Sequence, residues 1–225
     1  MIKAVIFDLD GTLLDRDQSV RVFINQQYER LMPHLSHILK ENFVQRFIEL
    51  DDHGYVWKDK VYQQLIEEFT IELSQEALLE DYLQQFKHHC VPFKNLHSML
   101  HNLKKQGLKQ GMITNGYGQF QLDNIRALGI EDDFDVILIS EWEGIKKPNA
   151  EIFHRALSKL EVSANESMYI GDHPFNDVEA AKKVGMVAIW KRNDGWQSVE
   201  ADYIMDNLIE IQDILVVLQK TRHDD

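Results

Sequence analysis

Residues 6–13 read IFDLDGTL, an apolar strand pattern that ends in two carboxylates, Asp8 and Asp10, just before Gly11. Side chains two residues apart in an extended segment point to the same face, about 6.5 Å apart along the strand. Like charges in this arrangement repel each other unless a cation, a proton or ample water stabilises the pair. The stretch therefore predicts the end of a strand, with a cation, a proton or water between the two carboxylates.

Three other interpretations of the same residues compete with a catalytic one. An Asp-Gly pair between apolar runs is a strong hairpin signal. A calcium loop needs glycine at its sixth position and glutamate at its twelfth, but with Gly11 sixth, Ile6 would be first and Asp17 last, so this interpretation fails at both ends. A solvated acidic turn leaves the apolar strand before it unexplained. The hairpin alternative stays open on these residues alone.

Composition limits the possible partners. The 225 residues carry a formal net charge of -13 and show no basic stripe, which disfavours a general nucleic-acid binder but allows small phosphate esters as ligands. No apolar run reaches the length of a membrane helix. A single cysteine, Cys90, fits a reducing compartment. We expect a cytoplasmic protein, monomeric or homodimeric, that binds neither nucleic acid nor membranes.

The periodicity of the apolar residues divides the chain into two domains. Residues 16–90 have helical spacing, with about four helices and breaks near Pro33, residues 53–54 and residues 70–74. From residue 91 onward, short apolar runs alternate with amphipathic helices, which indicates a parallel sheet covered on both faces. We predict an α/β fold: a Rossmann-like, doubly wound parallel sheet formed by residues 1–15 and 91–225, interrupted by an inserted α-helical bundle that acts as a cap domain.

Strands and helices of the sheet domain can be placed individually. The predicted strands cover residues 2–7, 109–115, 134–140, 167–171, 186–190 and 201–205. The predicted helices cover residues 96–106, 119–128, 150–160, 177–185 and 208–219. Four of these strands end in polar residues: Asp8 and Asp10, residues 114–116, residues 140–141 and residues 171–172. Because ligands bind at the carboxyl ends of parallel strands, we expect the chemistry at this edge of the sheet.

Four motifs occur in the order DLDGTLLD, MITNG, KKPNAEIF and YIGDHPFNDVEAAKKVG. Together they closely resemble those of the haloacid dehalogenase (HAD) superfamily of hydrolases, and the resemblance covers essentially the whole sequence, including a helical C1-type cap between the first two motifs. The core is most similar to the branch of small phosphatases that includes pyrimidine 5'-nucleotidases. The similarity to that branch lies in the catalytic domain and not in the cap.

The resemblance implies a role for each catalytic residue. Asp8 would be the nucleophile that attacks phosphorus to give an aspartyl phosphate. Asp10 would protonate the leaving oxygen and then accept a proton from the hydrolytic water. Lys147, favoured over Lys146 because it directly precedes Pro148, would neutralise charge in the transition state. The presence of Asp10 favours phosphoryl transfer over dehalogenation, because dehalogenating members lack this second acid.

The resemblance also implies a metal site and a phosphate site. Mg²⁺ would bind to Asp8, to the backbone carbonyl of Asp10 and to Asp172. Asp177 would be either an outer metal ligand or the partner that orients the lysine. An alternative for Asp172 is the N-cap of the helix that follows. For the phosphate, we expect the Thr114 hydroxyl and the amides of Asn115 and Gly116 as hydrogen-bond donors. An ordinary strand-to-helix turn is the alternative for these three residues.

These roles predict a Mg²⁺-dependent phosphatase that hydrolyses a small phosphomonoester. A nucleoside monophosphate is the favoured substrate, followed by phosphoglycolate or a sugar phosphate. One alternative is a phosphomutase of the β-phosphoglucomutase type, which passes the phosphoryl group to a sugar. Another is a non-catalytic protein that senses a phosphate ligand, although such a protein would not need both Asp8 and Asp10.

Overall fold

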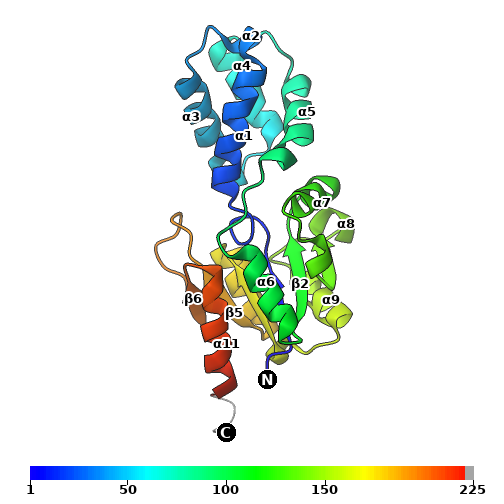
Figure 1. The fold of residues 1–225 in the computed structure, drawn as a ribbon. Coiled ribbons are helices and arrows are strands. Elements are labelled where there is room, and N and C mark those ends of the chain that lie inside the picture. The colour runs from blue at the N-terminus through cyan, green and yellow to red at the C-terminus, as the bar shows by residue number, and fades with distance from the viewer. Residues whose placement is uncertain (221–225) are drawn as a thin grey trace. The chain divides into compact units, whose positions relative to one another are not determined.

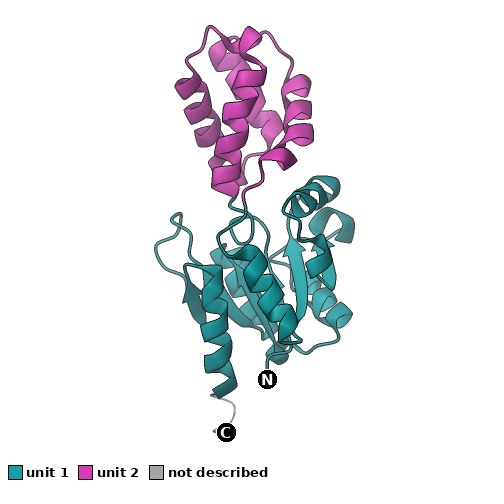
Figure 2. Ribbon diagram, viewed as in Figure 1, with its two compact units in different colours: residues 1–15, 92–225 teal, residues 16–91 magenta. Residues whose placement is uncertain are grey.

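A computed structural model of the chain describes residues 1–220. The chain forms two compact units, one consisting of Met1–Asp15 and Pro92–Asp225 and the other of Arg16–Val91 (Figure 2). None of the helices within residues 1–220 combines the length and apolar character that a bilayer-spanning segment requires.

The first unit is built on a parallel sheet of six strands, in the order β3-β2-β1-β4-β5-β6. The strands are β1 (Ala4–Phe7), β2 (Lys109–Thr114), β3 (Val136–Ile139), β4 (Ser167–Gly171), β5 (Val187–Lys191) and β6 (Tyr203–Met205). All residues of β1 and β4 are buried, as expected for central strands covered on both faces. The predicted Rossmann-like, doubly wound parallel sheet is confirmed.

The strand order places a topological switch point between β1 and β4. From β1, the chain builds β2 and β3 on one side of the sheet and later returns to build β4, β5 and β6 on the other. Phe7 lies in register with Met112 of β2 and with Ile170 of β4, so the three central strands end at nearly the same level. Residues that directly follow β1 and β4 are therefore neighbours at the edge where such sheets bind ligands.

Helices cover both faces of this sheet (Figure 1). They are α6 (Leu96–Lys105), α7 (Gly118–Ala127), α8 (Ser140–Glu143), α9 (Ala150–Leu160), α10 (Ala180–Val184) and α11 (Ile211–Lys220), with short turns η3 (Glu131–Asp133), η4 (Ala164–Glu166), η5 (Pro174–Glu179, a π-helix) and η6 (Leu208–Glu210). The amphipathic helix α9 buries Ile152, Phe153 and Ala156 in one core with Ala4 and Ile6 of β1. Helix α6 lies on the opposite face.

The second unit is a helical bundle with an aromatic core. Its elements are α1 (Arg16–Arg30), α2 (Met32–Leu35), α3 (Lys40–Asp51), η1 (Asp52–Gly54), α4 (Lys58–Phe69), α5 (Gln75–Gln85) and η2 (Phe86–His89). The rings of Phe23 and Tyr82 pack edge to face with centroids 5.1 Å apart, and those of Phe47 and Tyr62 lie 5.5 Å apart. Such pairs are each worth about 0.5–1.5 kcal/mol beyond their burial.

One buried ionic group joins three elements of the bundle. Asp51, at the end of α3, accepts two hydrogen bonds from the Arg16 guanidinium at 2.8 and 2.9 Å and forms an ion pair with Lys58 of α4. Burial alone would raise the pKa of Asp51, but the two cations prevail and hold it below its usual value. The carboxylate is therefore ionised and ties the start of α1 to α3 and α4.

Candidate active site

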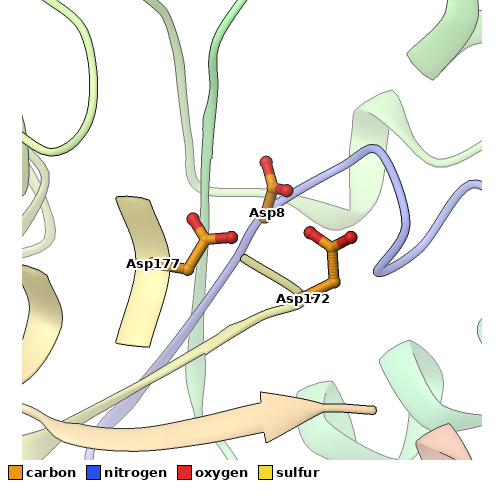
Figure 3. A group of neighbouring side chains, drawn as sticks. All are labelled: Asp8, Asp172 and Asp177. Atoms are coloured by element: carbon orange, nitrogen blue, oxygen red, sulfur yellow. The ribbon is translucent and has the colours of Figure 1, made fainter. Parts of the chain in front are cut away.

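Three carboxylates from separate parts of the chain converge at the carboxyl edge of the sheet (Figure 3). Asp8 follows β1, Asp172 follows β4, and Asp177 lies in η5. One oxygen of each lies within 4.8 Å of the others. Among residues 1–220, this is the one group of three or more acidic, histidine or cysteine side chains with the spacing of a metal site. The switch point between β1 and β4 explains the proximity of Asp8 and Asp172.

Two glycines allow this close approach. Gly11 has a φ of +75°, and a Cβ atom at this position would lie 2.2 Å from Oδ2 of Asp172. A Cβ atom at Gly171 would lie 2.4 Å from the Cβ of Asp177. Since real Cβ atoms do not approach other atoms so closely, any side chain at either position would displace one of the acids.

Lys147 is the cation of the site. Its Nζ donates to Oδ1 of Asp8 and to Oδ1 of Asp177, both at 2.7 Å, and its side chain is only 3% exposed. Burial alone would lower the pKa of Lys147, but Asp177 and Asp8 raise it above its usual value, so the ammonium stays charged. Lys146, its rival by adjacency, is exposed to solvent.

The charges in the site do not balance without a further cation. Three carboxylates face one ammonium, so full ionisation leaves two negative charges uncompensated. Accordingly, burial raises the pKa of Asp8, and the neighbouring acids Asp177 and Asp172 raise it further, despite the ion pair with Lys147. Burial and the charge of Asp177 raise the pKa of Asp172 to about 7. Hard oxygen donors with this excess charge fit a divalent cation such as Mg²⁺.

Asp177 binds the lysine and also faces the acidic cluster. Besides Lys147, its Oδ1 accepts a hydrogen bond from the Tyr169 hydroxyl at 3.1 Å, and its Oδ2 accepts from the amide of His173 at 3.0 Å. Tyr169 is fully buried in β4, and burial raises the pKa of its hydroxyl, which stays protonated and able to donate. The position of Asp177 is thus compatible with both roles left open for it, because it contacts Lys147 and also has an oxygen within 4.8 Å of oxygens of Asp8 and Asp172.

Asp172 is not a helix N-cap, contrary to the alternative from the sequence. Nδ1 of His173 accepts the amides of Phe175 and Asn176 at 3.1 and 3.2 Å and caps the π-helix η5. The predicted helix over 177–185 is consequently replaced by η5 followed by α10. Asp172 itself accepts a hydrogen bond from Asn193 Nδ2 at 2.8 Å on Oδ2.

The residues that follow β2 hold the site together by backbone and side-chain contacts. Asn115 makes two hydrogen bonds to the main chain of Lys147, from its Nδ2 to the carbonyl at 3.0 Å and from the lysine amide to its Oδ1 at 2.9 Å. The amide of Gly116 donates to Oγ of Ser140 at 3.0 Å. Thr114 is buried at the end of β2. Asn115 therefore positions the loop that carries the lysine, a role that the sequence did not suggest.

Asp10 lies outside the acidic cluster and is held from another direction. Nε2 of Gln121, in α7, donates to Oδ2 of Asp10 at 2.7 Å and to Oγ1 of Thr114 at 2.6 Å. The Gln121 amide thus links Asp10 and Thr114, two predicted site residues that are 104 positions apart in the sequence.

Sequence reasoning missed Gln121, Tyr169 and Asn193. Tyr169 carries a weak signal, because a tyrosine two residues before the glycine of a buried strand needs a partner for its hydroxyl. Gln121 lies on the buried face of α7, together with Asn124 and Ile125, and Asn193 lies in a loop, so neither belongs to a motif that would single it out.

Comparison with known proteins agrees with this geometry. A sequence profile described as "Haloacid dehalogenase-like hydrolase" matches residues 5–191. The glyceraldehyde 3-phosphate phosphatase of Pyrococcus furiosus is 27% identical, over 95% of this chain and 93% of that protein. The phosphoglycolate phosphatase of Vibrio vulnificus is 26% identical, over 96% and 97% of the two chains.

A solved structure is similar over nearly the same length. The crystal structure of a HAD phosphatase from Thermococcus onnurineus has a TM-score of 0.67 and 29% sequence identity to this chain, covering 95% of this chain and 98% of that one. The profile spans most of the sequence, from β1 to β5, and so includes all the acids and the lysine described above. With this match, the chain belongs to the haloacid dehalogenase-like hydrolases.

Proposed function

We propose that this hydrolase is a Mg²⁺-dependent phosphatase that cleaves a small phosphomonoester through an aspartyl phosphate on Asp8. The observation that carries the proposal is the position of Lys147 Nζ, 2.7 Å from both Asp8 and Asp177 at the buried switch point of the sheet. A buried carboxylate oriented by a buried ammonium is suited to form and release a covalent intermediate, which splits one difficult displacement into two easier ones.

In the first half-reaction, a carboxylate oxygen of Asp8 forms a bond to phosphorus while the bond to the leaving oxygen breaks. Asp10 donates a proton to that oxygen, so that an alcohol leaves. Lys147 compensates negative charge on Asp8 and the phosphoryl group, and the Thr114 hydroxyl donates to a phosphoryl oxygen. In the second half-reaction, Asp10 accepts a proton from water, the water oxygen bonds to phosphorus, and the bond between phosphorus and the Asp8 oxygen breaks, which regenerates the carboxylate and releases inorganic phosphate.

The acidic cluster would hold the metal ion. Asp8 and Asp172 would be direct ligands, together with the backbone carbonyl of Asp10, and Asp177 would be a direct or outer ligand. A bound Mg²⁺ supplies Lewis-acid stabilisation of the phosphoryl oxygens and compensates the charge of the carboxylates. The charge imbalance of three acids against one lysine supports this assignment.

The names of the relatives bear on the substrate. Two of the relatives are named as phosphatases of glyceraldehyde 3-phosphate and of phosphoglycolate. Both of these compounds are small anionic phosphate esters. We therefore place such two- and three-carbon phosphates ahead of the nucleoside monophosphates that the motifs favoured. Measuring kcat/KM for a panel of two- and three-carbon phosphates, nucleoside monophosphates and hexose phosphates would rank these substrate classes. Release of inorganic phosphate would distinguish hydrolysis from transfer of the phosphoryl group to a sugar.

Asp8→Asn tests the nucleophile. The amide has nearly the same shape but is a poor nucleophile, so we expect turnover of every ester in the panel to be lost. The matched control is Asp132→Asn, an exposed acid in the η3 turn, which should keep wild-type activity. Retention of phosphatase activity by Asp8→Asn, with a thermal unfolding midpoint like that of the wild type, would remove Asp8 from the mechanism.

A further inference from the structure

Gln121 is a buried polar residue to which neither the motifs nor the proposed reaction assigns a role. Its side chain lies at the start of α7 with 2% of the residue exposed. Besides its contacts with Asp10 and Thr114, its Nε2 lies 3.4 Å from the carbonyl of Asn115. On the other side, its Oε1 accepts a hydrogen bond from Nδ2 of Asn124 at 3.3 Å. The amide thus lies between the predicted acid and the predicted phosphate site.

The environment fixes which way this amide points. A carboxylate, a hydroxyl oxygen and a carbonyl surround Nε2, whereas the partner of Oε1 is an amide donor. Reversing the amide would set Oε1 against the Asp10 carboxylate and Nε2 against another NH₂ group, so the short hydrogen bond to Asp10 would be lost and two donors would face each other. Gly116 leaves room for the side chain, because a Cβ there would lie 2.8 Å from Cγ of Gln121.

An NH₂ group can only donate hydrogen bonds, so Asp10 and Thr114 both act as acceptors toward Gln121. Oδ2 of Asp10 is an acceptor, and a proton that Asp10 transfers is therefore carried by Oδ1. Oγ1 of Thr114 also accepts from Gln121, so its own hydrogen is directed away from the amide and is available to a phosphoryl oxygen. One side chain thereby orients both the acid and a phosphate donor.

We propose that Gln121 is a positioning residue for the hydrolysis: it presents Oδ1 of Asp10 to the leaving oxygen and the Thr114 hydroxyl hydrogen to the phosphoryl group. This inference rests on the proposed phosphatase function. It assigns Gln121 no contact with substrate, and its effect on the reaction passes through Asp10 and Thr114.

The dependence on the leaving group tests the inference. p-Nitrophenolate leaves without a proton, whereas the alkoxide of phosphoglycolate needs one from the general acid. For Gln121→Met, we expect kcat/KM with phosphoglycolate to fall about 10- to 100-fold more than with p-nitrophenyl phosphate, which is part of the roughly 10²- to 10⁴-fold that general acid catalysis contributes. Asp10→Asn should show the same selectivity, and adding Gln121→Met to Asp10→Asn should cause no further selective loss.

Two variants and one binding measurement guard against a purely structural explanation. Gln119→Met, at an exposed position of the same helix, should behave as wild type. Gln121→Glu, an isosteric change that replaces the donor by an acceptor, should repeat the selective loss and decides the question if Gln121→Met does not fold. Inorganic phosphate should inhibit both Gln121 variants several-fold more weakly, because the Thr114 hydroxyl is no longer oriented.

Equal losses with both esters, or no loss with either, would overturn the role of Gln121 and leave the phosphatase proposal standing. A wild-type enzyme that hydrolyses neither of these esters nor any other in the panel would overturn the phosphatase proposal and the role of Gln121 with it.

Discussion

At the scale of single residues, Lys147 decides the charge balance of the site. It is the cation that contacts Asp8 and Asp177 directly, at 2.7 Å from each, and both acids keep its ammonium protonated. Tyr169, whose hydroxyl lies 3.0 Å from Nζ, and the main-chain contacts of Asn115 restrict its position further. The lysine is thus held in place before any substrate binds.

Replacing the lysine should therefore be far more damaging than replacing its neighbour. We expect Lys147→Ala to lower kcat about 10²- to 10³-fold, the usual cost of removing one preorganised stabilising donor. Lys146→Ala, the exposed neighbour, should keep wild-type kcat. Phosphate release at saturating substrate measures both variants. If added Mg²⁺ restored the Lys147→Ala rate, the lysine would merely support the metal site.

The raised pKa values of Asp8 and Asp172 predict how the stability of the metal-free protein depends on pH. Asp172 has a pKa of about 7 in the fold against an ordinary value of 3.8, so between these two pH values the folded state binds more protons than the unfolded state. The free energy of unfolding should therefore decrease as pH rises from about 4 to about 7, by on the order of a few kcal/mol.

Thermal unfolding with EDTA and with Mg²⁺, at pH 5 and pH 8, measures this effect. Mg²⁺ should stabilise the wild type more at pH 8 than at pH 5, because the acids are then ionised. Asp172→Asn should lose most of the difference between the two pH values and most of the stabilisation by Mg²⁺. An equal response to Mg²⁺ in the wild type and in Asp172→Asn would exclude Asp172 as a ligand.

At the scale of elements, the site depends on how strand ends meet the turns that follow them. Asp8 and Asp172 come together because β1 and β4 are paired neighbours that end within one residue of each other. Asp177 joins them because the π-helix η5 turns back over the end of β4, where Gly171 leaves space for it. The positions of all three acids are thus properties of the backbone.

Gly171→Ala should disturb this arrangement without touching a reacting group. The new Cβ would overlap Asp177, so we expect a loss of stability of about 1–3 kcal/mol and at least a tenfold loss of kcat as Lys147 loses its partner. Gly129→Ala is the control, since it strains a backbone with a φ of +68° but has no atom within 4 Å of the new Cβ. Urea unfolding and kcat, measured together, should show a loss of stability in both variants and a loss of activity in Gly171→Ala alone.

The elements also show what could be predicted from sequence. All six strands follow from apolar runs between amphipathic helices, because strands buried on both faces leave that pattern. The predicted helix over 177–185 is helical up to Val184, but it begins earlier, at Pro174, because a ring nitrogen of His173 caps its start, and its first part is a π-helix. Gln121 and Asn193 were missed because their partners, Asp10 and Asp172, are distant in sequence and no local pattern links them.

At the scale of the whole molecule, the chain divides its work between two units. The sheet unit contains every residue that the proposed reaction uses, and the helical unit has a core of its own, with aromatic packing and the buried group of Arg16, Asp51 and Lys58. Replacing this buried carboxylate by a neutral group removes the negative charge that both cations contact. A conservative change at Asp51 should therefore affect the stability of the helical unit strongly.

Asp51→Asn should destabilise the helical unit by about 3–5 kcal/mol, the usual cost of breaking a buried ion pair by removing one partner. Glu67→Gln, at an exposed position of α4, should change its stability by less than about 0.5 kcal/mol. Urea unfolding followed by circular dichroism measures both. A midpoint for Asp51→Asn equal to that of Glu67→Gln would show that the buried group contributes nothing to stability.

The two connections to the helical unit lie side by side on the sheet unit. Leu14 pairs with Pro92 in an antiparallel bridge, and the amide of Phe93 donates to the carbonyl of Leu13 at 3.0 Å. The polypeptide thus leaves the sheet unit and returns to it at two adjacent points, about one interstrand spacing apart. A helical module of another size can therefore be inserted between residues 15 and 92 without moving β1, so the inserted unit can vary while the residues that follow β1 keep their place.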